Sequence, residues 1–258
     1  FAFLTISLPT GATPQTLNEA FASVDAKHWR FATDSEYEQL MQAHTWELVP
    51  RTEAKNVISG KWVFRIKKNA DGTIDRYKAR WVARGFSQKH GIDFTEIFAP
   101  TIRYASTRML LSLANHFDLD CYGLDVSNAF ARATVDEDLF VEQPHGYVQK
   151  PDSGSADVCK LRKCLYGTKY AGRLWHQKLR KFLIASGWKP YDSDPCIFSR
   201  TTKKYGHEFI GVYVDDIIHC CATENVHLEL LKACNTQFPT TSQGKLHWIL
   251  GIHITRDR

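Results

Sequence analysis

Apolar positions recur along the chain with two different spacings, which predict helices and strands in the same protein. Helical spacing extends from residue 13 to about 41, with Asp34 or Ser35 as the expected cap of a second helix in that stretch. It returns over residues 107–115 and 171–186. Alternation typical of strands marks residues 62–66, 74–83, 119–126, 209–214 and 217–221.

Two pairs of these strands are close enough in sequence to form hairpins. The first pair is joined by an expected turn at residues 70–72 and carries Lys and Arg along its length, as a mobile clamp would. The second pair is separated only by Asp215 and Asp216, which places two carboxylates at a hairpin tip. Two acids between apolar strands must be solvated or paired with a cation. An ordinary Asp-rich turn is the plain alternative to a functional site.

Composition places the chain among ordinary globular proteins. Its 258 residues are 43% hydrophobic and 24% charged, which fits one large domain or two small ones. No run approaches the roughly 18 apolar residues of a membrane helix. The chain begins without Met and ends on a strand-like segment, which predicts a piece of a longer polypeptide. The 7 cysteines favour a reducing compartment, and a zinc site at Cys159 and Cys164 is disfavoured because the ligand spacing is wrong.

The net charge of +5 conceals two strongly basic segments. Residues 61–89 contain nine bases and two acids, and residues 158–191 contain nine bases and no acid, so the rest of the chain carries −11. Aromatic residues are interleaved with the bases in both segments. A solvated face would explain one such segment. Two of them beside the carboxylate-rich residues 118–142 favour a protein that binds a polyanion by its phosphates, with metal chemistry nearby.

Tyr213-Val214-Asp215-Asp216, set between apolar strands, resembles the signature of reverse transcriptases. From about Thr45 onward the chain resembles the copia-type retrotransposon reverse transcriptase, through short motifs that follow the family's order. These motifs occupy residues 46–50, 61–67, 71–80, 85–88, 124–130, 142–146, 164–175, 193–196 and 250–252. The resemblance implies an RNA-directed DNA polymerase with an α+β right-hand fold of fingers and palm. The palm sheet would be antiparallel with packed helices, and the thumb mostly absent.

The same resemblance predicts the domain organisation and the metal site. Residues 1–44 would be a helical leader and residues 45–258 the polymerase domain. Nucleotide addition is an in-line displacement in which the attacking and leaving oxygens both gain charge, and two Mg²⁺ ions held by carboxylates can stabilise both. Mn²⁺ is the expected substitute. Asp125 and Asp215 would bridge the ions, Asp216 would assist and Val126 would add its carbonyl. The ligands implied are therefore Asp125, Val126, Asp215 and Asp216.

The resemblance also assigns residues to the nucleotide and the nucleic acid. Phe130 would be a steric gate against a ribose 2′-hydroxyl, a core aromatic being its plain alternative. Tyr166 and Gly167 would pack on the nucleotide. One or more of three bases would meet the triphosphate, namely Lys67, Lys78 and Arg80. Five further residues would contact the template–primer, namely Lys169, Arg173, Tyr213, Leu250 and Gly251.

Several departures from the family pattern bear on catalytic efficiency rather than on the fold. Thr168, Tyr170 and Gly172 replace the usual Leu, Gln and Pro, and Ser242-Gln243-Gly244 replaces a common Asp-Leu-Gly. Two functions are therefore compatible with the sequence: an active polymerase domain, and a catalytically inactive remnant that still binds nucleic acid. A two-metal nuclease is disfavoured because no histidine stands beside the carboxylates.

The expected partners also follow from the resemblance. They are RNA and DNA template–primers, deoxynucleoside triphosphates, and other parts of the same polyprotein, including integrase and ribonuclease H. No membrane partner is expected. The expected location is a cytoplasmic virus-like particle, or the nucleus with the integration complex.

Overall fold

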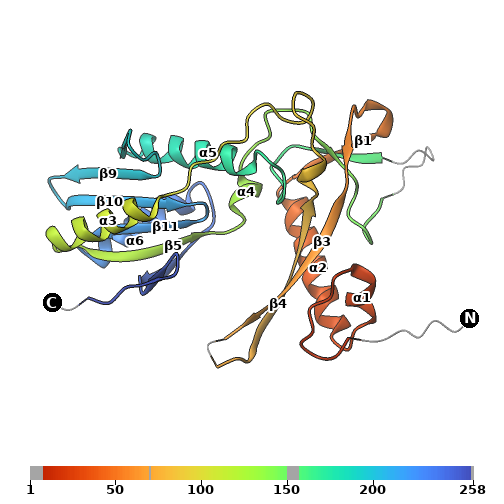
Figure 1. Cartoon of the computed structure of the whole chain (residues 1–258), viewed down its shortest axis with the longest axis horizontal. Coiled ribbons are helices and arrows are strands. Elements are labelled where there is room, and N and C mark those ends of the chain that lie inside the picture. Colours follow the sequence, from red (N-terminus) through yellow and green to blue (C-terminus); the bar gives the residue numbers. More distant parts are fainter. Residues whose placement is uncertain (1–7, 70, 150–156, 257–258) are drawn as a thin grey trace, which may run out of the picture. The chain divides into compact units, whose positions relative to one another are not determined.

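The structure is a computed structural model that describes residues 8–69, 71–149 and 157–256. The described residues form two compact units, coloured by sequence in Figure 1. The first unit contains the described residues within Phe1–Ile97 and Phe130–Ala171, and the second contains those within Phe98–Ala129 and Gly172–Arg258. Both contain helices and strands, so the expected mixture of α and β structure is confirmed.

Two helices open the first unit, α1 (Leu17–Ala22) and α2 (Ala26–Gln42). The break between them falls at Asp25, so the expectation that a second helix begins at Asp34 or Ser35 is wrong. Asp25 is held outside the helices because its carboxylate accepts a hydrogen bond from the backbone N–H of Gly11 at 2.7 Å. Asp34 and Ser35 lie inside α2 instead.

A long antiparallel hairpin of β3 (Gly60–Lys68) and β4 (Ile74–Ala83) confirms the first predicted hairpin. The turn was expected at residues 70–72, of which Ala70 lies outside the described residues. The Asp71 carboxylate accepts a hydrogen bond from the Thr73 N–H at 2.9 Å. Helix α2 packs on β4. The buried Trp29 of α2 meets the ring of Tyr77 edge-on, with ring centroids 4.7 Å apart. The helical segment at the start of the chain therefore belongs to the same unit as the basic hairpin.

A second sheet of the first unit has the strand order β1-β7-β6-β2, with a parallel pair between β2 and β6. Its strands are β1 (Trp46–Pro50), β2 (Val57–Ile58), β6 (Phe140–Val141) and β7 (Asp157–Leu161). Short helical turns complete the connections, namely η1 (Arg51–Glu53), η2 (Gly85–Ser87) and α4 (Ala129–Arg132).

The second unit is built on a six-stranded sheet in which all neighbouring strands are antiparallel, in the order β12-β5-β11-β10-β9-β8. The strands are β5 (Asp120–Val126), β8 (Lys189–Pro190), β9 (Ile197–Thr202), β10 (Gly206–Tyr213), β11 (Asp216–Cys221) and β12 (Thr240–Lys245). A two-stranded ribbon follows, made of β13 (Trp248–Ile249) and β14 (Ile252–His253).

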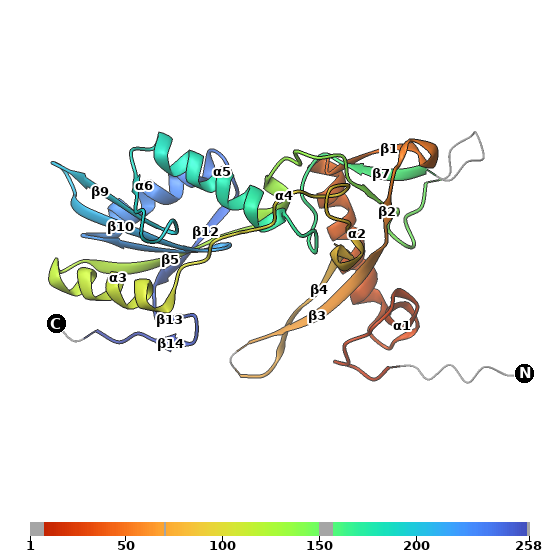
Figure 2. The same ribbon diagram turned by 45° about the horizontal axis from the view of Figure 1, so that its top comes forward.

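Helices cover both faces of this sheet, as Figure 2 shows. They are α3 (Tyr104–His116) on one face, and α5 (Ala171–Ala185) and α6 (Glu224–Asn235) on the other. Gly211 of β10 lets α3 approach closely, because a Cβ there would lie 2.6 Å from a methyl carbon of Leu110. Val226 of α6 packs on Tyr122 and Cys221 from the opposite side. No helix in the described ranges is long and apolar enough to cross a membrane.

Candidate active site

The hairpin between β10 and β11 confirms the second predicted hairpin, but its tip lies one residue earlier than expected. The two turn residues are Val214 and Asp215, whereas Asp216 already pairs with Tyr213 as the first residue of β11. Val214 adopts a left-handed φ of 57°, which is costly for a β-branched residue. Its carbonyl accepts a hydrogen bond from the Trp175 indole at 2.6 Å, so a helix stabilises the turn.

The third aspartate, Asp125, lies on the strand next to the hairpin, directly opposite Asp216. Asp125, near the end of β5, is the register partner of Asp216 on β11, and the Val126 N–H donates to the Asp215 carbonyl at 3.0 Å. Directly opposed residues in an antiparallel pair project from the same face of the sheet. The structure therefore brings together the four residues expected to bind metal, although they come from distant parts of the sequence.

The site concentrates negative charge. Burial raises the pKa of Asp216, and the charges of Asp215 and Asp125 raise it further, while a hydrogen bond from Gln243 acts in the opposite direction. Within the described ranges, no three His, Cys, Asp or Glu side chains stand close enough together to hold a metal ion as arranged. The backbone therefore places the aspartates side by side without closing a ligand cage around a cation.

Three residues expected at the nucleotide meet in the first unit. The Arg80 guanidinium lies over the Tyr166 ring, 4.3 Å from its centroid. Phe130 meets the same ring edge-on, with centroids 5.2 Å apart. The Nε atom of Arg80 is buried and has no hydrogen-bond partner in the described structure. A buried donor in this state can accommodate a polar ligand without breaking an existing bond.

The other two candidate bases lie on the same hairpin. Lys67 pairs with Arg76 across the ladder, and Lys78 is two residues from Arg80 on β4. Burial lowers the pKa of Lys78, and the charges of Arg80 and Arg76 lower it further. Mutual repulsion among these bases would be relieved by a bound anion.

Gly167 fixes the loop that carries Tyr166. Its φ is 86°, and a Cβ at this position would lie 2.1 Å from the Ala83 carbonyl oxygen at the end of β4. The Ala83 N–H in turn donates to the Tyr166 carbonyl at 2.8 Å. The loop therefore docks on β4 through a backbone contact that only glycine permits.

We expect Gly167→Ala to destabilise the protein by more than the roughly 1–2 kcal/mol that a left-handed conformation costs an ordinary residue, because the new methyl group would also displace Ala83. Gly206→Ala is the matched control, since Gly206 has a φ of 70° but no atom within 4 Å of the added Cβ. Urea unfolding of both variants measures the difference. Equal losses in free energy of unfolding would mean that the backbone contact contributes nothing.

The residues expected to contact the template–primer are distributed over both units. Lys169 belongs to the first, where its Nζ donates to the Gln88 carbonyl at 3.3 Å. The others belong to the second. Arg173 lies on α5 and Tyr213 ends β10, while Leu250 and Gly251 form the turn between β13 and β14. The Leu250 carbonyl accepts a hydrogen bond from the Tyr104 hydroxyl at 3.1 Å.

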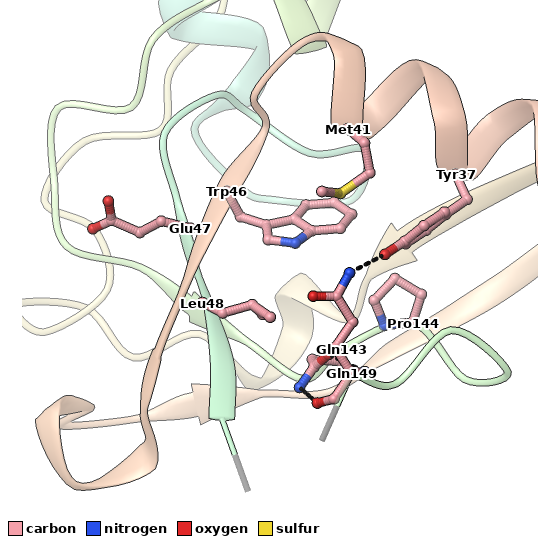
Figure 3. A pocket seen from close by; sticks show the side chains of 8 residues that line it. All are labelled: Tyr37, Met41, Trp46, Glu47, Leu48, Gln143, Pro144 and Gln149. Carbon is pink, nitrogen blue, oxygen red and sulfur yellow. Dashed lines mark hydrogen bonds between the residues drawn. The ribbon is translucent and has the colours of Figure 1, made fainter. Parts of the chain in front are cut away.

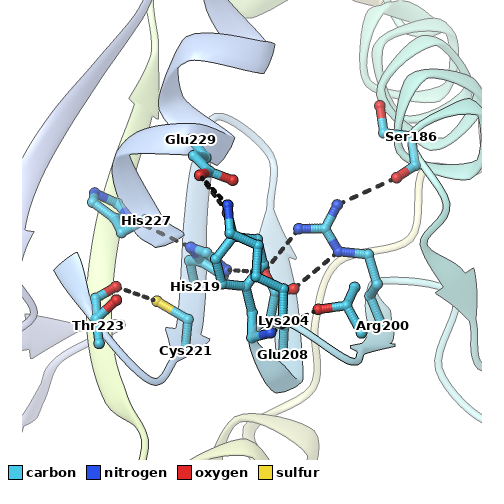
Figure 4. Close-up of polar contacts among 11 residues, drawn as sticks. Ser186, Arg200, Lys204, Glu208, His219, Cys221, Thr223, His227 and Glu229 are labelled. Atoms are coloured by element: carbon cyan, nitrogen blue, oxygen red, sulfur yellow. Dashed lines mark hydrogen bonds and ion pairs between the residues drawn. The ribbon is translucent and has the colours of Figure 1, made fainter. Parts of the chain in front are cut away.

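The sequence gives no indication of a buried chain of polar side chains in the second unit (Figure 4). Arg200 donates twice to Glu208, from Nε at 3.0 Å and from Nη2 at 2.8 Å. His219 directs Nε2 toward Glu208, 3.4 Å away, which favours the proton on Nε2. Its Nδ1 then accepts from His227 Nδ1 at 3.4 Å, and His227 Nε2 accepts from the Ser242 hydroxyl at 2.8 Å.

Two Nδ1 atoms that face each other cannot both carry a proton, so at least one of these two buried histidines is neutral, which predicts a pH-dependent stability. Burial, followed by the neighbouring His219, lowers the pKa of His227 from 6.5 to about 4. Between these values the unfolded chain binds more protons than the folded one, so stability falls as the pH falls. The shift corresponds to a loss of about 3 kcal/mol between neutral pH and pH 4.

Urea unfolding as a function of pH tests this prediction. His227→Gln should flatten the profile, and part of the slope should remain because burial also lowers the pKa of His219. His207→Gln is the control, because His207 is exposed. An unchanged slope in His227→Gln would show that His227 does not titrate as described.

A separate pocket of about 230 Å³ lies in the first unit (Figure 3). Gln149 closes one side by donating to the Tyr37 hydroxyl at 3.1 Å, and the side chain of Gln143 bonds the Gln149 backbone at both its N–H and its carbonyl. None of the predicted site residues lines the pocket.

Comparison with known proteins identifies the family of proteins to which the chain belongs. Residues 43–258 match the family described as reverse transcriptase (RNA-dependent DNA polymerase). The chain is 35% identical over 245 residues to the retrovirus-related Pol polyprotein from transposon TNT 1-94 of Nicotiana tabacum, covering 95% of this chain and 18% of the relative. It is 36% identical over 254 residues to the corresponding polyprotein from transposon RE1 of Arabidopsis thaliana, covering 98% and 17%.

The chain belongs to the reverse transcriptase family, and its resemblance to the copia-type enzymes is confirmed. It spans less than a fifth of the length of either polyprotein. A solved structure of a foamy viral protease–reverse transcriptase in complex with double-stranded DNA is also similar, with a TM-score of 0.40 and 14% identity, covering 84% of this chain and 32% of that one.

Proposed function

We propose that the chain is the RNA-directed DNA polymerase part of a copia-type Pol polyprotein, which adds deoxynucleotides to a primer 3′-hydroxyl. The observation that carries the proposal is the placement of Asp125 directly opposite Asp216, with Asp215 in the adjoining turn, in a member of this family. The second unit would then correspond to the palm, and the hairpin of β3 and β4 to part of the fingers.

The aspartates would hold two Mg²⁺ ions, or Mn²⁺ in their place, with the Val126 carbonyl as a further ligand. Their chemistry fits, because carboxylate oxygens suit hard cations and because a cation would offset the repulsion that raises the Asp216 pKa. When bound, such ions stabilise charge on the attacking and leaving oxygens. The chain itself contributes the pairing of β5 with β11, which fixes the spacing of Asp125 and Asp216.

Within the first unit, Arg80 is the base best suited to a triphosphate. Its guanidinium is oriented by the Tyr166 ring, and its unpartnered Nε leaves a donor for a phosphate oxygen. Lys67 and Lys78 would add positive charge on the same hairpin. Phe130, which also packs on Tyr166, would exclude a ribose 2′-hydroxyl by its shape.

We expect Phe130→Ala to raise ribonucleotide incorporation relative to deoxynucleotide incorporation by about 10- to 100-fold, the range that pocket shape alone can supply. The measurement is the ratio of kcat/KM for matched deoxy and ribo substrates. Phe86→Ala, at a Phe that is 80% exposed in the same unit, should leave the ratio unchanged. If Phe130→Ala alters stability but not this ratio, Phe130 is a core aromatic and not a steric gate.

The partners proposed are RNA and DNA template–primers and deoxynucleoside triphosphates. The two basic segments support the nucleic-acid partners, since phosphate contacts dominate such binding. The Pol polyprotein relatives support association with further parts of the same polyprotein. Integrase and ribonuclease H are the parts we propose. The site of action proposed is a cytoplasmic virus-like particle, or the nucleus with the integration complex.

Measuring binding and extension side by side separates an active polymerase from an idle remnant. A labelled RNA template with a DNA primer is titrated with the chain at two salt concentrations, and extension is then followed with Mg²⁺ and deoxynucleotides. We expect salt-sensitive binding by both the wild type and Asp215→Asn, with extension by the wild type alone. Salt-sensitive binding without extension dependent on Asp215 would favour the remnant.

A further inference from the structure

Two cysteines face each other across the pair of strands β5 and β11. Cys121 and Cys220 are register partners, and their Sγ atoms are 3.5 Å apart. Opposed residues of an antiparallel pair have Cα atoms about 4.5–5.5 Å apart, within the roughly 4.4–6.8 Å that a disulfide spans. The backbone therefore permits a bond between these sulfurs with little strand movement.

Cys121 is the accessible member of the pair. All 7 cysteines lie in the described ranges as free thiols, and six of them are buried, whereas Cys121 is partly exposed. Cys121 lines a cavity of about 650 Å³, together with Lys245 and Arg256. The Asp120 carboxylate lies 3.3 Å from Lys245 Nζ and 3.7 Å from Arg256 Nη1. Because both bases already have an acidic partner, we do not interpret the cavity as an anion-binding site.

The surroundings of Cys121 also favour its thiolate. The contact with Cys220 lowers the pKa of Cys121, and the positive charge of Arg256 adds to this effect. The pKa of Cys220 is raised by the same contact and by burial. One sulfur is therefore nucleophilic and reachable, and its neighbour is protected and close.

We propose that Cys121 is an oxidation site for hydroperoxides and that Cys220 is its resolving cysteine. The Cys121 thiolate attacks one oxygen of the peroxide, the O–O bond breaks, and water or an alcohol leaves once protonated. Cys121 is then a sulfenic acid. The Cys220 sulfur attacks the Cys121 sulfur, the S–S bond forms as the S–O bond of the sulfenic acid breaks, and the hydroxyl leaves as water with the Cys220 proton. The peroxide is reduced and the two thiols are oxidised.

The product would be a crosslink between the two strands that carry the aspartates. Cys121 precedes Asp125 by four residues, and Cys220 follows Asp216 by four residues. The oxidation site does not depend on polymerase activity, because it rests on the thiols and their surroundings alone.

Peptide mapping under non-reducing conditions tests the proposal on the whole chain. After brief treatment with hydrogen peroxide and blocking of the remaining thiols, we expect one new species joining the peptides of Cys121 and Cys220, which dithiothreitol reverses. Before oxidation, a short pulse of iodoacetamide should label Cys121 at least tenfold faster than any other cysteine. A different pairing, or faster labelling elsewhere, would overturn the assignment.

Single substitutions separate the two roles. Cys220→Ala should accumulate a Cys121 sulfenic acid that dimedone traps, and Cys121→Ala should leave Cys220 unmodified at the same dose of peroxide. Cys221→Ala is the matched control, because the Cys221 thiol donates to the Thr223 carbonyl and packs on Tyr122. It should form the Cys121–Cys220 disulfide at the wild-type rate. Dimedone labelling of wild-type Cys121 equal to that of Cys220→Ala would show that Cys220 does not resolve it.

Discussion

Glu208→Gln should lower the free energy of unfolding by about 3–5 kcal/mol, the usual cost of removing one partner from a buried ion pair. The side chain of Glu208 is fully buried, and both of its oxygens accept hydrogen bonds from Arg200. A Gln amide in its place would remove the negative charge. Its NH2 group would also face Arg200 or His219, so that two hydrogen-bond donors would oppose each other. His219, which contacts His227, would then lose the carboxylate that lies 3.4 Å from its Nε2 (Figure 4).

Urea unfolding monitored by circular dichroism measures the loss. Glu229→Gln is the matched control, because Glu229 is about half-exposed and pairs with Lys204 on the surface, where ion pairs contribute little. Replacing both partners, as Arg200→Met with Glu208→Leu, should recover most of the lost stability, since no unpaired charge remains. A Glu208→Gln protein as stable as Glu229→Gln would contradict the role given to the buried pair.

Asp125→Asn should reduce the rate of primer extension by at least about a hundredfold. Under the proposed function Asp125 is a ligand of the catalytic ions, so its loss would weaken interactions that contribute several kcal/mol to the transition state, and each 1.36 kcal/mol is about a factor of ten in rate. Strand pairing should survive, because β5 pairs with β11 through its backbone. Binding of Mn²⁺, followed by electron paramagnetic resonance without substrate, should weaken in parallel with the rate.

Asp138→Asn is the control for this experiment. The Asp138 side chain is 72% exposed, pairs with Lys160 at 2.9 Å and has no role in the proposed chemistry. It should retain the wild-type rate and the wild-type affinity for Mn²⁺. A wild-type rate in Asp125→Asn would remove Asp125 from the set of metal ligands.

Local pattern predicts much of this fold because the periodicity of side chains reflects which face is buried. The alternation over 209–221 predicts β10 and β11, and the apolar stripe over 171–186 predicts α5. The tip of the β10–β11 hairpin lies one residue earlier than the sequence predicts, because the conformation of Val214 depends on Trp175, which is distant in sequence. The start of α2 was missed for a similar reason, since Asp25 is fixed by Gly11.

The candidate site was likewise predictable from the sequence only in part. The paired aspartates of the hairpin were recognisable in the sequence, but the register that sets Asp125 opposite Asp216 follows from strand pairing. The buried chain at Glu208 was not recognisable, because His219 and His227 appear in sequence as single polar residues among apolar ones. Only the packing of α6 on β11 and β12 brings them together.

The central claim, polymerase activity on an RNA template, is tested most directly by a single primer-extension measurement. The chain is incubated with a DNA primer annealed to RNA, Mg²⁺ and all four deoxynucleotides, beside a version extended past Arg258 along the proposed parent polyprotein. We expect product that lengthens with time, requires Mg²⁺ and disappears in Asp215→Asn. Absence of extension by both versions, while both still bind the template–primer, would contradict the assignment.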